Sequence, residues 1–91
     1  MLHIVTRLHF VETLSSYVLE KDSILLVEEA VYAINPKHKL HACLPKQVTL
    51  KALQPDVSAR GLEAVCATHI ECVDFAGFVD LTAEHSKSLT W

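Results

Sequence analysis

Cysteine and histidine gather in two short stretches of the sequence, and both residue types can bind zinc. The two stretches read Cys66-x-x-His69-x-x-Cys72 and His38-x-x-His41-x-Cys43. A structural zinc site needs four such side chains to converge, usually from two closely spaced pairs. Cys72 falls in an expected strand, where residues three apart point to opposite faces, and the chain has no Cys-x-x-Cys pair. We therefore expect no metal site.

A single cysteine could instead act as a thiolate nucleophile or as a persulfide carrier. Such a thiol needs solvent access and a helix N-terminus or a cation beside it. Cys72 is the best placed, two residues before a helix that Asp74 is expected to cap, and Cys66 has His69 nearby. Glu71 and Asp74 flank Cys72, however, and neighbouring anions disfavour a thiolate. The residues favour structural cysteines, with Cys72 and Cys66 as the alternative reactive thiols.

Carboxylates follow two of the expected strands, at the edge where ligands meet an open α/β sheet. Glu28 and Glu29 follow one strand and Asp74 follows another. They could form a group for acid–base catalysis, or each could cap a helix N-terminus, and capping is what we expect. The chain has no Gly-rich phosphate loop and no Gly-x-Ser-x-Gly turn. We therefore expect no catalytic residue and no cofactor, and a structural role for His3.

The size and composition indicate one domain, covering residues 1–91. A net charge of −3 argues against direct nucleic-acid binding. We find no membrane-spanning run, no export signal and no disulfide spacing among the three cysteines, so we expect a cytoplasmic protein. A mean hydropathy of +0.27 is high for so small a chain, and we expect other subunits to cover the excess apolar surface.

Strand and helix patterns alternate along the chain. Apolar runs predict strands at residues 2–5, 23–27, 48–53 and 70–73. Helical patterns fall between and after them, at residues 10–20, 28–34, 54–60 and from residue 75 onward. Short connections between alternating strands and helices favour parallel pairing with right-handed crossovers. We therefore expect a small three-layer α/β sandwich, flavodoxin-like, with a mostly parallel sheet of four to five strands.

The first and last helical patterns each have an apolar face. The first face combines Phe10, Leu14, Tyr17 and Val18, and the last combines Phe75, Phe78, Val79 and Thr82. Phe75, Phe78 and Trp91 are candidate interface anchors, because aromatic side chains dominate interface energies, with core packing as the alternative for the two phenylalanines. Arg60 could pair with a carbonyl at a helix end or with a neighbouring subunit.

Several segments together form a familiar pattern. They are the opening Met1-Leu2-His3, residues 25–33, residues 59–62, and residues 73–82 followed by the terminal Trp91. In this order and at this length they resemble the TusB/DsrH family of sulfur-relay subunits, and the closing segment is the most specific part. The resemblance implies the DsrE-like version of the sandwich.

The resemblance also implies partners. Family members assemble with TusC- and TusD-like paralogues as a dimer of heterotrimers, which accepts persulfide sulfur from a TusA-like carrier and passes it to a TusE-like carrier. That relay ends in 2-thiouridine at the tRNA wobble position. The sulfur-carrying cysteine belongs to the TusD/DsrE subunit. Some DsrH proteins also have one in the first helix, but residues 13–18 of this chain contain none.

We therefore expect a non-catalytic subunit of a TusBCD-like sulfur-relay complex. Three alternatives remain open. The chain could be the DsrH-like subunit of a DsrEFH complex in dissimilatory sulfur oxidation, a sulfur carrier that uses its own Cys72 or Cys66, or a stand-alone homo-oligomeric binding module.

Overall fold

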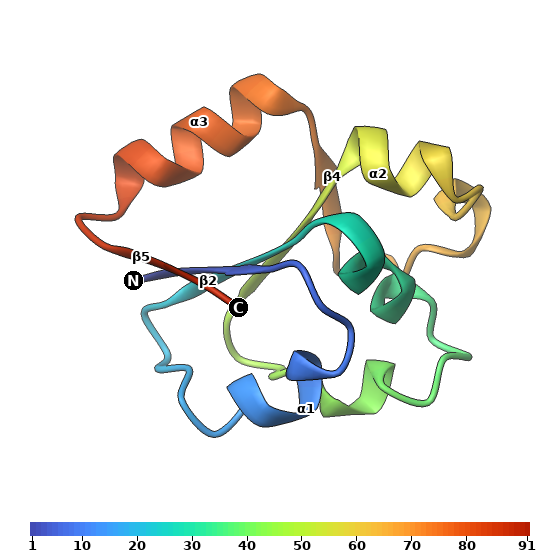
Figure 1. The fold of residues 1–91 in the computed structure, drawn as a ribbon, viewed down its shortest axis with the longest axis horizontal. Helices are drawn as coiled ribbons and strands as arrows, with labels where there is room; N and C mark the ends of the chain where they lie inside the picture. Colours follow the sequence, from blue (N-terminus) through green and yellow to red (C-terminus); the bar gives the residue numbers. More distant parts are fainter.

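A computed structural model describes all residues of the chain, and its centre is one parallel sheet (Figure 1). The strands are β1 (Leu2–Val5), β2 (Ser23–Leu26), β3 (Thr49–Leu53), β4 (Glu71–Val73) and β5 (Ser88–Thr90). Neighbours pair in parallel in the order β4-β3-β2-β1-β5. The predicted α/β class and parallel sheet are confirmed. The strand order differs from that of flavodoxin itself, which is 2-1-3-4-5.

Helices and 3-10 turns connect the strands. They are α1 (Phe10–Leu14), α2 (Gln54–Ala59) and α3 (Phe75–Glu84), with the 3-10 segments η1 (Glu28–Ile34), η2 (His41–Cys43) and η3 (Glu63–Val65). The helix expected after Glu28 is thus a 3-10 helix, and Glu28 itself has a positive φ of 50°. No helix has the length and apolar character needed to cross a bilayer.

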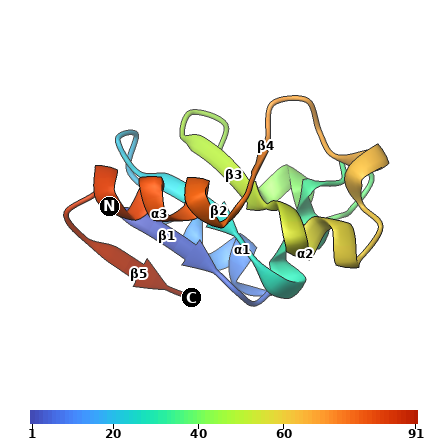
Figure 2. The same cartoon turned by 90° about the horizontal axis from the view of Figure 1, so that it is seen from above.

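The two faces of the sheet carry unequal cores, because side chains alternate between the faces along each strand. The larger core lies under α1, η1 and α2 and includes Ile24 and Leu26 of β2. The smaller one lies under α3 alone and includes Leu25 of β2 and Leu81 of α3. Figure 2 shows α3 lying along the sheet from above. One face is therefore covered by a single helix.

The first helix is shorter than the sequence pattern predicts. It ends at Leu14 rather than continuing through Val18, and Tyr17 is 63% exposed. Ser15 gives the physical reason, since its hydroxyl donates a hydrogen bond to the Glu12 carbonyl at 2.8 Å and competes with helix continuation. The prediction of an apolar stripe reaching Tyr17 was wrong.

The last helix packs through a different face from the predicted one. Leu81 is its buried residue, and Phe78 packs partly buried against the smaller core. Phe75 and Val79, four residues apart on the opposite side, are 61% and 63% exposed. The alternative prediction that Phe75 packs in the core is therefore wrong. Phe75 and Val79 form an apolar face of α3 that is exposed to solvent.

Gly77 marks a close approach between α3 and β4. A Cβ added there would lie 2.8 Å from the Cβ of Val73, which cannot swing away as a long side chain could. We expect Gly77→Ala to lower the free energy of unfolding by about 1–2 kcal/mol, because the clash outweighs the helix-propensity gain of alanine. Urea denaturation measures this, and a more stable Gly77→Ala protein would show that the two elements are free to separate.

Candidate functional site

Cys66 and Cys72 are neighbouring thiols that pack partly buried against the larger core. The Cys66 thiol also faces two backbone carbonyls, those of Ala67 at 3.4 Å and Ile70 at 3.5 Å. Burial first, and then the neighbouring Cys72, raise the pKa of the Cys66 thiol to about 11. Cys66 is therefore a protonated thiol at neutral pH and not a nucleophile.

We expect this thiol to react slowly with alkylating agents. With a pKa of about 11, only about one Cys66 in ten thousand is a thiolate at pH 7. Iodoacetamide labelling followed by peptide mass spectrometry should modify Cys66 far faster in urea-unfolded protein than in folded protein. Equal rates in the two states would contradict the environment described for Cys66.

The histidines and cysteines of the two sequence clusters do not assemble a metal site. His41 and His69 approach each other, with ring centroids 5.5 Å apart. Nowhere in the chain do three His, Cys, Asp or Glu side chains converge in a way that could hold a metal ion.

The strand-end carboxylates bind backbone N–H groups. Asp74 accepts a hydrogen bond from Gly77 N at 2.8 Å, so the predicted cap of α3 is present. Glu29 instead accepts a hydrogen bond from Leu8 N, in the β1–α1 connection, at 3.0 Å. Glu28 has no capping bond, and this part of the capping prediction was wrong.

Glu28, whose backbone is in the left-handed region, is held by Asp56, a residue that no sequence pattern singles out. The Glu28 backbone N–H donates to the Asp56 carboxylate at 2.6 Å. Asp56 thus ties the turn after β2 to the start of α2. The carboxylates at this edge therefore brace loops, and no two of them form a hydrogen-bonded acid–base pair.

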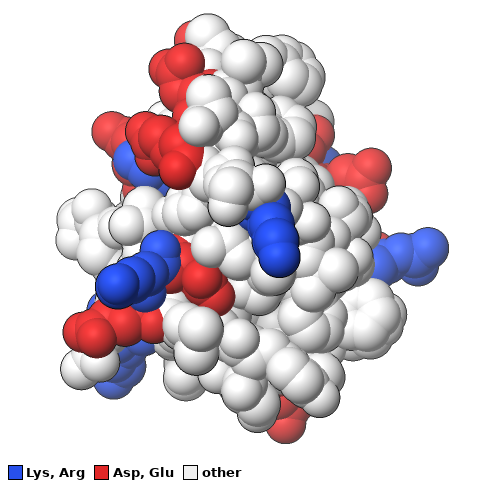
Figure 3. Space-filling view, turned by 90° about the vertical axis from the view of Figure 1, so that its left-hand side faces the viewer, with Lys and Arg blue, Asp and Glu red and all other residues white.

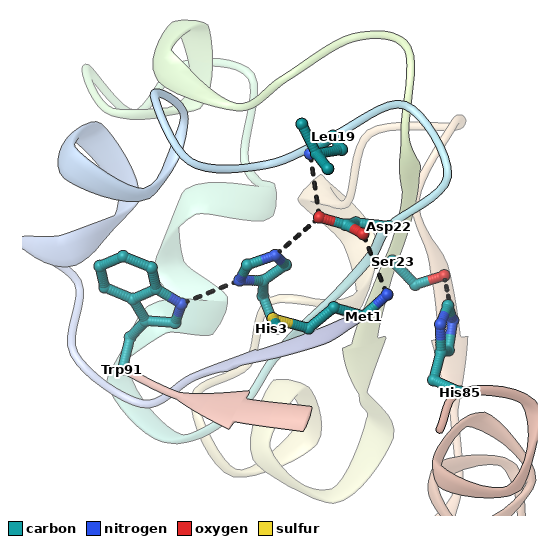
Figure 4. Close-up of polar contacts among 7 residues, drawn as sticks. All are labelled: Met1, His3, Leu19, Asp22, Ser23, His85 and Trp91. Carbon is teal, nitrogen blue, oxygen red and sulfur yellow. Dashed lines mark hydrogen bonds and ion pairs between the residues drawn. The ribbon is translucent and has the colours of Figure 1, made fainter. Parts of the chain in front are cut away.

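Asp22 is the centre of a polar network that joins both ends of the chain (Figure 4). Its carboxylate accepts from the Met1 ammonium at 3.0 Å and from Leu19 N at 2.9 Å, and it contacts His3 Nε2 at 3.0 Å. Trp91 Nε1–H donates to His3 Nδ1 at 3.1 Å. Because an indole only donates, His3 must carry its proton on Nε2 and donate it to Asp22.

His3 and Asp22 of this network are buried, and their contacts determine the pKa of the Asp22 carboxyl. His3 is 2% exposed. Burial by itself raises the pKa of a carboxyl, but Leu19 N–H, His3 and the Met1 ammonium together outweigh it and hold the pKa of Asp22 well below its usual value. The Asp–His pair resembles part of a catalytic triad, yet an indole donor occupies the position of a nucleophile.

Trp91 and Arg60, two of the candidate interface residues, make contacts inside the chain. The Trp91 carbonyl accepts from the Thr6 hydroxyl at 2.6 Å, and the indole packs against Tyr17 with centroids 5.6 Å apart. Arg60 Nη1 donates to the Asp56 carbonyl in α2 at 3.4 Å, and its guanidinium lies 5.8 Å from the centre of the Tyr32 ring. Of the two contacts expected for Arg60, this structure contains the one with a helix carbonyl.

Exposed apolar side chains gather in two places. One is the outer face of α3, formed by Phe75 and Val79, which we call the α3 face. The other surrounds the chain termini and comprises Met1, Tyr17, Leu19 and Leu89. Figure 3 looks at the side that carries β5, the N-terminus and the end of α3, and shows a broad area with few charged side chains. These surfaces are the molecule's most evident candidates for contact with other proteins.

Comparison with known proteins identifies the family. The sequence model of the family described as "DsrH like protein" matches residues 7–88. The chain belongs to the DsrH family. The resemblance noted in the sequence is thereby confirmed over nearly the whole chain.

This DsrH-family chain is similar to proteins named Protein TusB. It is 33% identical over 81 residues to the one from Pectobacterium parmentieri, covering 88% of this chain and 85% of that protein. It is 30% identical over 79 residues to the one from Photorhabdus laumondii, covering 86% and 83%. The crystal structure of the YchN protein from E. coli has the same fold, with a TM-score of 0.72, 18% identity, and 99% and 97% of the two chains covered.

Proposed function

We propose that this DsrH-family chain is a non-catalytic subunit of a cytoplasmic, TusBCD-like sulfur-relay complex that supports 2-thiolation of the tRNA wobble uridine. The similarity of this chain to TusB proteins over most of their length supports a role in that pathway. The observation that carries the subunit role is the α3 face, where Phe75 and Val79 lie in solvent on a helix that packs its other side on the sheet. A partner chain would bury such a face.

The relay chemistry then belongs to other chains. In a sulfur relay, a thiolate attacks the outer sulfur of a persulfide, so that sulfane sulfur moves from one cysteine to the next and the donor cysteine leaves as a thiolate. The raised pKa of Cys66 speaks against this chain as the carrier through that residue. TusC- and TusD-like subunits would complete a dimer of heterotrimers, with sulfur entering from a TusA-like carrier and leaving to a TusE-like carrier.

Complementation tests this role. Deletion of the gene should strongly reduce 2-thiouridine in tRNA, measured by mass spectrometry of tRNA nucleosides. The wild-type gene should restore it, and so should a Cys43→Ala/Cys66→Ala/Cys72→Ala variant, because no thiol of this chain is required.

Two outcomes would overturn parts of the proposal. A triple variant that still co-purifies with its partners but restores no thiouridine would make this chain a sulfur carrier. Unchanged thiouridine in the deletion strain would remove the tRNA role and favour a DsrEFH-type function in sulfur oxidation.

A further inference from the structure

A hollow of about 500 Å³ opens on the surface between η2 and the loop that precedes β4. It is lined by His41, Ala42, Leu44, Lys46 and His69. The buried Leu44 and the small Ala42 give it an apolar lining, and the three remaining side chains are basic. No carboxylate lines it, which is notable in a chain with a net charge of −3.

The sequence around the hollow is also positively charged. Residues 30–55 contain four lysines and no Asp or Glu, a local charge of +4 that leaves −7 for the rest of the chain. One of the four, Lys51, pairs with Glu71 on the neighbouring strand. The other three, Lys37, Lys39 and Lys46, lie in the irregular segment between η1 and β3 that forms one wall of the hollow. A concave surface with one sign of charge concentrates counter-ions.

The orientation of His41 is fixed by the backbone. Its Nδ1 lies 2.7 Å from the Ala33 carbonyl, which can only accept, so Nδ1 carries a proton. That contact is the ring's one hydrogen bond, which leaves Nε2 available to a ligand. The ring of His69 meets His41 edge to face, at 71° between planes. His41, His69 and Lys46 therefore border one space.

We propose that this hollow binds a phosphate-type oxyanion, either free inorganic phosphate or the phosphate group of a nucleotide. Lys46 supplies a permanent charge, and His41 and His69 supply N–H donors. Because Nδ1 of His41 already donates to Ala33, Nε2 is a second donor only when both ring nitrogens are protonated. A metal ion fits less well, because two imidazoles provide only two ligands, no third converges, and the Lys46 ammonium repels cations.

Calorimetric titration of the full chain, or of its complex, with inorganic phosphate tests the site. We expect saturable binding with a dissociation constant at or below about 10 mM. The groups that border the ligand, from η2, the segment after it and the loop before β4, are His41, Lys46 and His69.

Variants locate the binding. Lys46→Gln and His69→Asn should each weaken phosphate binding by about threefold or more, whereas Lys21→Gln, at an exposed lysine outside the hollow, should leave it unchanged. Adenosine monophosphate bound more tightly than phosphate would assign the site to a nucleotide, and equal or weaker binding would assign it to free phosphate. Absence of saturation, equal weakening by Lys21→Gln, or binding of zinc in place of phosphate would overturn the proposal. The proposed subunit role does not depend on the result.

Discussion

Replacing Asp22 by asparagine is expected to lower the free energy of unfolding by about 3 kcal/mol. The buried carboxylate binds three donors, namely the Met1 ammonium, Leu19 N–H and the His3 ring. An amide removes the charge from all three hydrogen bonds and leaves His3 buried beside a weaker partner. Urea denaturation of the two proteins measures the difference.

Asp80→Asn provides the matched control, because Asp80 is exposed on α3 and makes no hydrogen bond through its carboxylate. It should change stability by less than about 0.5 kcal/mol. A similarly small change for Asp22→Asn would show that the network does not hold the chain ends in place.

The stabilisation by Asp22 also has a defined pH dependence. Because the folded pKa lies below the unfolded one, the contribution is fully present above the ordinary carboxyl pKa of 3.8 and is lost as the pH falls toward the folded value. The stability difference between wild type and Asp22→Asn should therefore be largest near neutrality and shrink in acid. A difference that grew in acid would contradict a lowered Asp22 pKa.

The second large effect is expected on assembly rather than on folding. Val79→Asp places a charge on the α3 face and should weaken binding to the partner subunits by at least about 2 kcal/mol, roughly thirtyfold. The free energy of unfolding of the isolated chain should change little, since the Val79 side chain is 63% exposed. Co-purification yield and a quantitative binding titration with the partner subunits provide the measurement.

Val65→Asp is the control for this substitution. Val65 is another exposed valine, but it lies in η3, beside α2 and away from α3 in both ribbon views (Figures 1 and 2). It should leave assembly intact. If Val65→Asp and Val79→Asp weaken assembly equally, the α3 face is not the contact.

The sequence predicts the central sheet well and its edge poorly. The buried runs at β1 and β2 are apolar enough to be read directly, because strands covered on both faces lack polar alternation, whereas β3 alternates Thr49 and Lys51 with buried Leu50 and Ala52. Strand β5 has only three residues, all exposed, and two of them are polar. It is extended because it pairs with β1, a tertiary contact that no local pattern records.

Polar contacts, too, are predictable from the sequence where they are local and not where they are tertiary. The Asp74 cap acts within one helical turn, so its sequence context is enough to predict it. The Asp22 network joins residues 19, 21 and 88 positions apart, and neither Asp22 nor its partners follow a recognisable motif. Asp56 escapes prediction for the same reason, since it binds Glu28 N from 28 residues away. The exposed side of α3 is ambiguous in sequence because apolar residues occupy both of its faces.

Native mass spectrometry of the tagged chain isolated from its own cells, followed by the intact mass of each component, tests the non-catalytic subunit role most directly. We expect two partner chains of similar size in equal amounts, with the mass of an added sulfur atom on a partner and none on this chain. Recovery of this chain alone, or with the added sulfur on one of its own cysteines, would contradict its assignment as a non-catalytic subunit.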